Sequence, residues 1–468
     1  MRPSSETEAL FAVLRQSAEP AVADAIEQLV HNGSDAALCR VNVIDFAARH
    51  GLGEQAVIGA FLHAARLGIF ELSWNVLCPG CAGVLDAGTT LKTVDRSSYL
   101  CSLCNTDYEP TLDEMVEVTF TVSPRVRRIV AHDPATLPLV DYLRQIFWSS
   151  GIDLPDEAAL AAILDEIALD QIDLPAREKT TISLPLPEGF IVAFDPVTHA
   201  TQFMDVKGEP TRERQNLTVV LNKEHAPAGT AEMRPGPARI VFENHTDGRT
   251  LPCLLIAGDR MHDLLAKRRP FLTAKRMLTN QTFRDIYRTD TLDIDQKLKI
   301  ISLTFLFTDL KGSTELYERV GDLVAYDMVR AHFRVLHEIV AAEAGAVVKT
   351  IGDAVMATFP TPGRALAAAL RMRDAMAELN KDLLLKIGIH EGPCLAVVLN
   401  ERQDYFGQTV NIASRVQNLA SNQSIYVTGA VVENGEASRL LEQSGIRPIA
   451  QAHALRGIAH QVPVFEIP

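Results

Sequence analysis

Asp309 places a carboxylate at the end of a predicted strand, where a metal ion and a phosphate can be bound together. The strand is the apolar run from Ile301 to Phe307, and Lys311-Gly312-Ser313-Thr314 then leads into a predicted helix. The amides of a helix N-terminus can hold phosphate oxygens, and the carboxylate can hold Mg²⁺. Taken alone, this aspartate also fits an ordinary helix cap.

A second carboxylate, Asp353, lies in VVKTIGDAVMATF, where two short apolar runs flank a Gly-Asp pair as in a β-hairpin. If the hairpin pairs with the first strand, Asp353 lies beside Asp309. Two such carboxylates can bind the two metal ions of an in-line phosphoryl displacement. The alternative is a plain turn without a function, and Lys349, four residues earlier, is by itself an ordinary solvated side chain.

The segment DYFGQTVNIASR adds polar groups of another kind. Asp404 is at a predicted strand end, and Asn411 and Arg415 are four residues apart on one face of the following predicted helix. An arginine there can neutralise charge that develops on a phosphate. The alternative is an amphipathic helix with Arg415 exposed.

FTDLKGST, KTIGDAVMATF and DYFGQTVNIASR together resemble the class III nucleotidyl cyclases, in the family's order and at compatible spacing. The resemblance covers residues 300–468. It implies three pairs of residues: Asp309 and Asp353 bind two metal ions, Lys349 and Asp404 recognise the purine, and Asn411 and Arg415 orient the ribose and stabilise the transition state.

The purine pair fits adenine. An aspartate accepts a hydrogen bond from the N6 amine and a lysine donates to N1, whereas guanine presents a carbonyl oxygen and a protonated N1. Guanylyl cyclases characteristically place Glu and a Cys-type residue at the positions of Lys349 and Asp404. The resemblance therefore implies an adenylate cyclase that converts ATP to 3′,5′-cyclic AMP and pyrophosphate, with two Mg²⁺ or Mn²⁺ in each active site.

Further contacts are implied by the same resemblance. It implies that the backbone of Leu310 contacts a metal ion. It also implies substrate contacts by Thr308, Gly312, Ser313, Thr314 and Arg456. Arg456, in HALRGIAHQVPVFEI, replaces a triphosphate-binding lysine of the family. In the family the site lies between two catalytic domains, and this chain carries both residue sets, which implies a head-to-tail homodimer.

Four cysteines near residue 100 form a separate constellation. Cys78 and Cys81 make one C-x-x-C pair and Cys101 and Cys104 another, with 19 residues between the pairs. This spacing predicts a four-cysteine zinc ribbon with one structural Zn²⁺. Thiol redox sensing is the alternative.

The elements predict a multidomain α+β chain. The expected parts are a helical, winged-helix-like region at 1–74, the zinc ribbon at 75–120, a helical segment plus an antiparallel β domain at 121–258, a helical connector at 259–298, and the catalytic domain at 299–468. For the last we expect an α/β sandwich with a ferredoxin-like βαββαβ core. The N-terminal part resembles an uncharacterised module fused to bacterial class III cyclases, which implies regulation of intracellular signalling by a ligand or protein.

Two other functions compete with an adenylate cyclase: a catalytically silent nucleotide sensor, and a zinc-dependent DNA-binding regulator that uses its helix-turn-helix spacing. The net charge of −14 and the weakly basic second helix argue against nucleic acid as a partner. No apolar run of membrane-spanning length and no signal peptide is evident, so we expect a cytoplasmic protein without a membrane partner.

Overall fold

The computed structural model describes residues 5–95, 97–223, 229–287, 292–293, 295–311, 318–379, 384–399, 402–420, 424–451, 455, 458 and 461–468. The chain forms two units. One comprises Met1–Thr89, Thr93–Pro110 and Glu114–Leu272, and the other comprises Thr90–Lys92, Thr111–Asp113 and Thr273–Pro468. Among the described residues, none of the helices combines the length and apolar character that crossing a bilayer requires.

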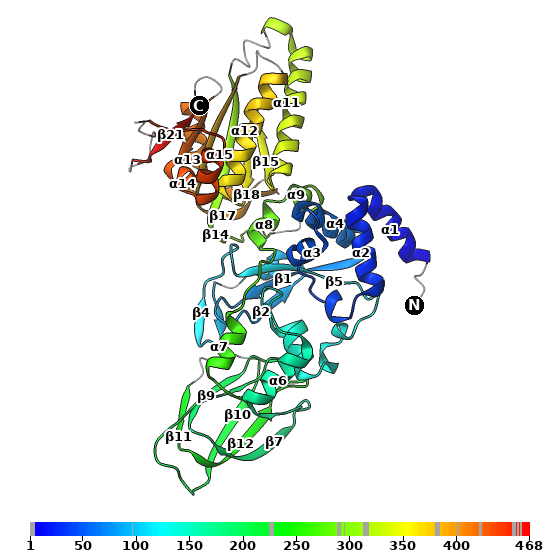
Figure 1. The fold of residues 1–468 in the computed structure, drawn as a ribbon, viewed down its shortest axis with the longest axis vertical. Coiled ribbons are helices and arrows are strands. Elements are labelled where there is room, and N and C mark those ends of the chain that lie inside the picture. Colours follow the sequence, from blue (N-terminus) through cyan, green and yellow to red (C-terminus); the bar gives the residue numbers. More distant parts are fainter. Residues whose placement is uncertain are drawn as a thin grey trace. The chain divides into compact units, whose positions relative to one another are not determined.

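The first unit begins with four helices, drawn in blue in Figure 1: α1 (Ser5–Ser17), α2 (Pro20–Asn32), α3 (Val43–His50) and α4 (Glu54–Arg66). Asn42 starts α3, because its side chain accepts hydrogen bonds from the backbone N–H groups of Ile44 (3.1 Å) and Asp45 (3.2 Å). Gly51 ends α3 in the left-handed conformation, at a φ of 63°.

A three-stranded sheet of order β2-β1-β5 follows these helices, made of β1 (Phe70–Leu77), β2 (Val84–Gly88) and β5 (Val116–Val122). The boundaries predicted at residues 74 and 120 fall inside β1 and β5, which pair along their length. The strands β3 (Tyr99–Cys101) and β4 (Thr106–Tyr108) form a separate hairpin. The helical part and the cysteine part therefore share one sheet.

Short helical turns and then a β sandwich complete the first unit. The helical pieces are α5 (Leu139–Tyr142), the π-helical turn Leu143–Phe147, α6 (Glu157–Ile167) and, after the sandwich, α7 (Asp259–Ala266). The strands are β6 (Ala168–Gln171), β7 (Lys179–Leu186), β8 (Gly189–Phe194), β9 (Thr201–Val206), β10 (Gln215–Leu221), β11 (Thr230–Met233), β12 (Gly236–Asn244) and β13 (Cys253–Ile256).

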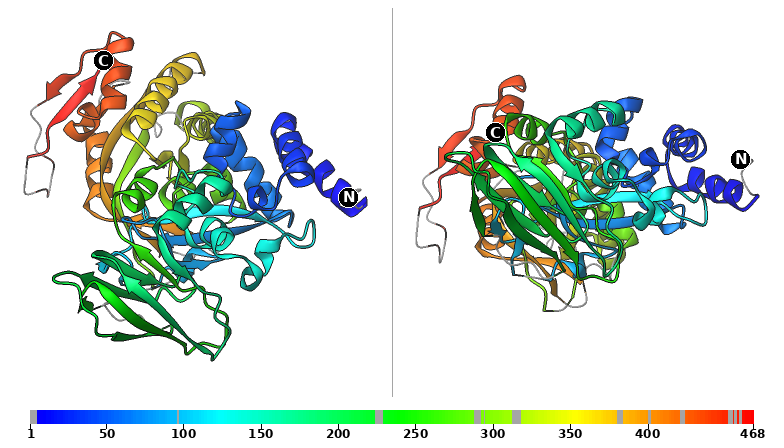
Figure 2. Two further views of the ribbon diagram at one scale, coloured as in Figure 1. Left: turned by 60° about the horizontal axis from the view of Figure 1, so that its bottom comes forward. Right: turned by 90° about the horizontal axis from the view of Figure 1, so that it is seen from below.

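These strands form two sheets, of order β10-β12-β7 and β11-β9-β8-β13-β6, which are drawn in green in Figure 2. Their inner faces share one core, in which Ile191 and Met204 of one sheet meet Ile240 and Phe242 of the other. The prediction of an antiparallel domain was wrong in part, because β10 with β12 and β11 with β9 pair in parallel. A half-buried strand shows the same alternation in either pairing, so the sequence pattern does not distinguish them.

The second unit holds the C-terminal elements. The helices are α8 (Ala274–Leu278), α9 (Gln281–Ile286), α11 (Asp322–Ala342), α12 (Pro362–Leu379), α13 (Gln408–Leu419), α14 (Gly429–Val432) and α15 (Gly435–Gln443). The strands are β14 (Leu298–Lys311), β15 (Ala346–Ile351), β16 (Ala354–Phe359), β17 (Leu384–Leu399), β18 (Arg402–Phe406), β19 (Ile425–Thr428), β20 (Ile449–Gln451) and β21 (Val464–Ile467).

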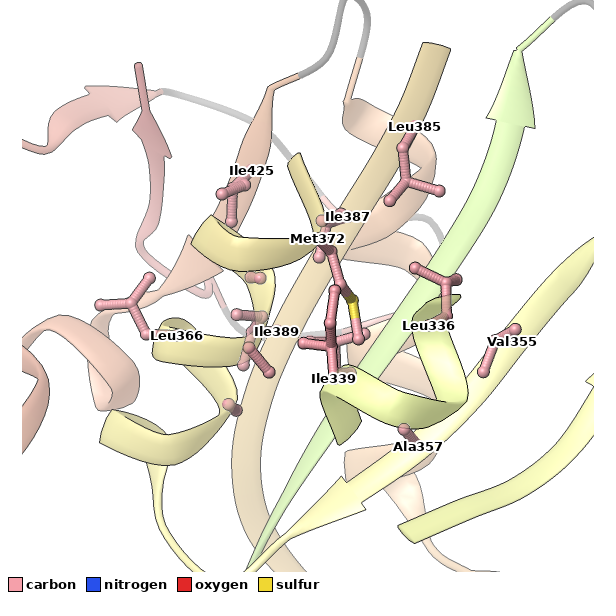
Figure 3. Packing of buried hydrophobic residues seen from close by; sticks show 14 of the residues in the cluster. Leu336, Ile339, Val355, Ala357, Leu366, Met372, Leu385, Ile387, Ile389 and Ile425 are labelled. Carbon is pink, nitrogen blue, oxygen red and sulfur yellow. The ribbon is translucent and has the colours of Figure 1, made fainter. Parts of the chain in front are cut away.

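The order β14–α11–β15–β16–α12–β17 is the predicted βαββαβ sequence of elements, and the strands β15, β16, β14 and β17 pair antiparallel side by side. Helices α11 and α12 pack on this sheet through Leu336, Ile339 and Met372, which meet Ile387 and Ile389 of β17 (Figure 3). Burial of such side chains holds the strand ends in fixed register.

The tripeptide Thr111–Asp113 belongs to the second unit, although the residues on both sides of it belong to the first. The Asp113 carboxylate accepts hydrogen bonds from the backbone N–H groups of Ile301 (2.6 Å) and Ser302 (3.3 Å), where the register of β14 with β17 shifts. Lys275 of α8 lies 3.1 Å from the same carboxylate. Asp113 thereby satisfies two amides at an irregular point of β14.

Candidate active site

The two aspartates lie at the same end of adjacent strands. Thr308 of β14 pairs with Val355 of β16, so one further step along this antiparallel register places Asp309 opposite Ala354, next to Asp353. The hairpin turn at 352–353 requires its glycine, because Gly352 has a φ of +64°.

The surroundings of the two carboxylates suit a cation. In the described part of the chain, Asp353 Oδ2 is buried and has no hydrogen-bond partner, whereas Asp309 Oδ2 lies 3.7 Å from Lys386 Nζ. A buried carboxylate oxygen without a partner is costly, and a hard cation with oxygen ligands would satisfy it. The donor set therefore fits Mg²⁺ or Mn²⁺.

A buried histidine lies close to this pair. His332 of α11 is fully buried, and its Nδ1 is 3.2 Å from Met376 Sδ. Burial lowers the pKa of His332 to about 4, although the charge of Asp353 acts in the opposite direction. At neutral pH the imidazole is therefore uncharged and does not compete with a metal ion for Asp353.

Two other predicted residues of this strand end are buried. The Thr308 hydroxyl accepts a hydrogen bond from the backbone N–H of Val355 at 3.1 Å, so the structure gives this side chain a part in holding β16. The side chain of Leu310 belongs to the hydrophobic core, and its backbone pairs with Leu385. Gly312, Ser313, Thr314 and Arg456 lie outside the described residues.

Lys349 and Asp404 meet. Lys349 Nζ donates a hydrogen bond to Asp404 Oδ2, although one residue is on β15 and the other on β18. The Asp404 side chain is 9% exposed and the Lys349 side chain 42% exposed, so the lysine lies toward solvent and the aspartate toward the interior. Asp404 Oδ1 also accepts a hydrogen bond from the backbone N–H of Tyr405 at 2.8 Å. The pair offers one acceptor and one cationic donor side by side.

Arg284 of α9 fixes the two strands that carry this pair. Its Nη2 donates to the carbonyl oxygens of Gln403 (2.9 Å) and Val348 (3.4 Å), the residues directly before Asp404 and Lys349. Sequence reasoning missed Arg284, because an arginine in a short polar helix carries no sign of what it contacts.

Gln281 and Tyr405 make similar links. Gln281 Oε1 accepts a hydrogen bond from the backbone N–H of Val347 at 2.7 Å. The Tyr405 hydroxyl donates to the carbonyl oxygen of Leu278 at 3.3 Å, and burial raises its pKa to about 12, so it remains a donor. Helices α8 and α9 are thus bonded to both strands of the lysine–aspartate pair.

Asn411 and Arg415 are one turn apart on α13. Gly388 of β17 lets this helix approach the sheet, because a Cβ there would lie 2.2 Å from the backbone nitrogen of Gln417. Asn411 is exposed, and Arg415 Nη1 is buried without a hydrogen-bond partner among the described residues. Between described residues, no hydrogen bond or ion pair joins Asn411 or Arg415 to Asp309 or Asp353.

The four cysteines come together as predicted from their spacing. Their Sγ atoms all lie within 4.8 Å of one another, with Cys78 and Cys104 3.5 Å apart and Cys81 and Cys101 3.6 Å apart. These separations exceed the roughly 2 Å of a disulfide. They approach the roughly 3.8 Å edge of a tetrahedron with zinc–sulfur bonds of about 2.3 Å. Thiol–thiol hydrogen bonding lowers the pKa of Cys78 and raises those of Cys81 and Cys101. The cluster fits a tetrahedral thiolate-binding metal.

Residues 296–449 match the family model of the adenylate and guanylate cyclase catalytic domain. The C-terminal part thus carries a class III nucleotidyl cyclase catalytic domain. Residues 4–285 match a family of unknown function, DUF5939, and because this match spans more than half of the chain, the chain belongs to that family.

The relatives include enzymes of both base preferences. An adenylate cyclase of Streptomyces griseus is 34% identical over 135 residues, which are 28% of this chain and 33% of that protein. Guanylate cyclase 32E of Drosophila melanogaster is 28% identical over 148 residues, 28% of this chain and 13% of that protein. The chain thus spans a third or less of the length of these two relatives. The structure of the adenylyl cyclase CyaB from P. aeruginosa has 22% identity, covers 37% of this chain and 96% of that chain, and has a TM-score of 0.33.

Proposed function

We propose that the chain is an adenylate cyclase, which converts ATP to 3′,5′-cyclic AMP and pyrophosphate. The observation that carries the choice of base is the hydrogen bond between Lys349 and Asp404. The Asp404 carboxylate accepts a hydrogen bond from the adenine N6 amine, and Lys349 donates to N1. Guanine would place its carbonyl oxygen, an acceptor, against the Asp404 carboxylate, and its protonated N1, a donor, against the Lys349 ammonium group.

The residues of this chain bind and orient the reacting groups. Asp309 and Asp353 would hold two Mg²⁺ or Mn²⁺ ions, and these ions would supply the positive charge that lowers the pKa of the ribose 3′-hydroxyl and offsets the phosphate charge. Asn411 orients the ribose. Arg415 donates to the phosphate on which charge develops, and its buried Nη1, which has no partner among the described residues, is a donor available for that purpose.

The bond changes follow from this arrangement. The 3′-oxygen forms a bond to the α-phosphorus, the bond from that phosphorus to the pyrophosphate oxygen breaks, and the hydroxyl proton passes to solvent. Arg415 faces the charge that accumulates on the phosphate oxygens, so it stabilises the transition state more than bound ATP. The cations that Asp309 and Asp353 would hold would add positive charge there. Thr308, Gly312, Ser313, Thr314, the backbone of Leu310 and Arg456 complete the proposed contacts to the metals and the triphosphate.

A head-to-tail homodimer assembles the complete site. One protomer supplies Asp309 and Asp353, and its partner supplies the purine pair and the α13 pair. This division is the one that the resemblance to the class III cyclases implies. Each dimer then has two equivalent sites.

We further propose that the N-terminal family module regulates the catalytic domain. The residues that match this family include Asp113, which bonds to β14, and Arg284, which bonds to the strands of the purine pair. A change in α8 and α9 would thus alter the spacing of Lys349 and Asp404. Cys78, Cys81, Cys101 and Cys104 hold one structural Zn²⁺ in this module, and their free thiols suit the reducing cytoplasm.

A complementation assay tests both activity and assembly. Asp353→Ala and Arg415→Ala each remove one of the two residue groups, so each variant alone is expected to lose cyclic AMP formation. When the two are mixed and exchange subunits, one of the two sites in a heterodimer keeps all its residues, and activity should return to a fraction of the wild-type rate. Inactive mixtures in which heterodimers are detected by mass would contradict the shared site. A wild-type chain that forms no cyclic nucleotide would contradict the enzyme and favour a silent nucleotide sensor.

A further inference from the structure

The first unit contains a cavity of about 400 Å³ beside α3. Its deep part is formed by Ile152, which is fully buried, and by Gln145 and Trp148, each 7% exposed. Its outer part is formed by Arg49 and Asp156, which are exposed. Small-molecule sites usually have volumes of roughly 300–1,000 Å³ and join a buried floor to an open mouth. The cavity has the size and depth of such a site.

Arginines dominate the charged part of the wall. Four guanidinium groups line the cavity, those of Arg40, Arg49, Arg144 and Arg269. Arg49 and Arg269 share one carboxylate, that of Asp45, at 2.5 and 3.7 Å. Arg40 Nη2 lies 3.8 Å from the fully buried carboxylate of Glu117. Three arginines therefore have an acidic partner.

Arg144 is different. Its Nη1 donates to the carbonyl oxygen of Pro155 at 2.8 Å, and in the described part of the chain it has no carboxylate within ion-pair distance. Asp156 is the remaining acid in the wall, but it is exposed and its Oδ1 caps α6 by accepting from the N–H of Ala159 at 2.8 Å. Counting Glu117, which partners Arg40 from outside the cavity lining, the four guanidinium groups exceed the three carboxylates by one, and the wall favours an anion.

The floor has unused hydrogen-bonding groups of both kinds. Gln145 Oε1 and Trp148 Nε1 are buried and have no hydrogen-bond partner among the described residues, and the same is true of Arg40 Nη2. The Gln145 amide is oriented, since its Nε2 donates to Asp141 Oδ1 at 3.2 Å. Burying an acceptor and a donor without partners is costly, so a ligand that supplies both is favoured.

We propose that this cavity is the ligand site of the N-terminal module and that it binds a small organic anion. The carboxylate or phosphate of the ligand pairs with Arg144, and its polar body accepts from Trp148 and donates to Gln145. An arginine fork binds either anion in a bidentate manner, so carboxylate and phosphate share this chemistry. All lining residues belong to the first unit, and the site is therefore independent of whether the catalytic domain makes cyclic AMP.

Isothermal titration of the full chain tests the site with three probes: succinate for a carboxylate, glycerol 3-phosphate for a phosphate, and glycerol as the neutral body. At least one anion is expected to bind and glycerol is not. Arg144→Gln is expected to weaken the binding by about 10- to 100-fold, the loss of one charge-assisted contact. Arg128→Gln, an exposed arginine outside the cavity, serves as the matched control and should bind as the wild type does.

Two further variants distinguish binding in this cavity from binding at the proposed active site. Arg415→Gln should keep the binding, because it alters only the proposed active site. Trp148→Phe, which removes the indole N–H and keeps a ring, should weaken it several-fold. Each variant is compared in its unfolding temperature without probe, and if Arg144→Gln does not fold, Arg144→Lys replaces it and should also weaken binding. Binding of neither anion, or equal binding by the wild type and the Arg144 variant, would overturn the proposal.

Discussion

Exchange of the purine pair is expected to reverse or abolish the preference for ATP. The double variant Lys349→Glu with Asp404→Cys removes the acceptor that faces the adenine N6 amine and the donor that faces N1. The glutamate in turn accepts from the protonated N1 of guanine. These are the residue types that the resemblance associates with guanylyl cyclases.

The size of the effect follows from the burial of the pair. With guanine in the wild-type site, each of the two mismatches leaves a charged group unpaired, at about 1.5–3 kcal/mol. The Asp404 side chain is 9% exposed, so its mismatch has nearly the full cost, whereas water reaches the 42% exposed Lys349 and reduces its share. We therefore expect about 3 kcal/mol in total, or roughly 100-fold in the ratio of kcat/KM for ATP to that for GTP.

The assay measures kcat/KM with ATP and with GTP, and mass spectrometry identifies the cyclic product formed from each. The double variant should lower the ATP-to-GTP ratio by about 100-fold or more. Asp404→Asn, which keeps the shape but can donate, should lower it by roughly tenfold. Lys297→Glu with Asp327→Cys makes the same charge change at exposed positions of the same domain and should leave the ratio unchanged.

If the double variant folds, still forms product, and keeps the wild-type ratio within threefold, the hydrogen-bonded pair does not read the purine. The proposed adenine contacts would then have to be withdrawn.

Three further outcomes are expected. Arg284→Gln removes the bonds to the strands of the purine pair, so it should lower kcat/KM for ATP by about tenfold and bring the kcat/KM values for ATP and GTP closer together. A loss of activity that only follows a loss of folded protein in thermal melting would refute a positioning role. Elemental analysis of the wild-type chain should find one zinc per chain. Cys101→Ser should lose this zinc and lower the unfolding temperature by roughly 5–10 °C, while Cys39→Ser should retain the metal. Burial lowers the pKa values of His332 and His390 to about 4, so between about pH 6.5 and pH 4 only the unfolded chain binds these protons. The free energy of unfolding should therefore fall over this range as the pH drops, by at most about 3 kcal/mol per histidine. In urea unfolding, His390→Asn should show a shallower dependence of this free energy on pH, and an unchanged dependence would contradict this.

The order of elements in the catalytic domain could be predicted because its signals are local. The apolar run before Asp309 and the Gly-Asp turn at 352–353 each identify one element without reference to the rest of the chain. The meeting of Lys349 with Asp404 came from the resemblance alone, since the two residues are 55 positions apart. Their contact depends on how β18 turns back beside β17.

The contacts that support the site could not be predicted. Asp113 bonds to Ile301 across 188 positions, and Arg284 bonds to Gln403 across 119. Each rests on a single polar residue whose type also fits a solvated surface, so only the tertiary structure reveals it. The parallel pairs of the β sandwich were missed for a related reason, because strand alternation reports which face is buried and not the direction of the neighbour.

The proposed adenylate cyclase activity is tested most directly by incubating the purified chain with ATP or GTP in the presence of Mg²⁺ or Mn²⁺. The chain should form 3′,5′-cyclic AMP and pyrophosphate in equal amounts from ATP, with a rate lower by about 100-fold for GTP, and Asp353→Asn should form neither product. Cyclic GMP as the main product, or cyclic AMP formed equally well by Asp353→Asn, would contradict it.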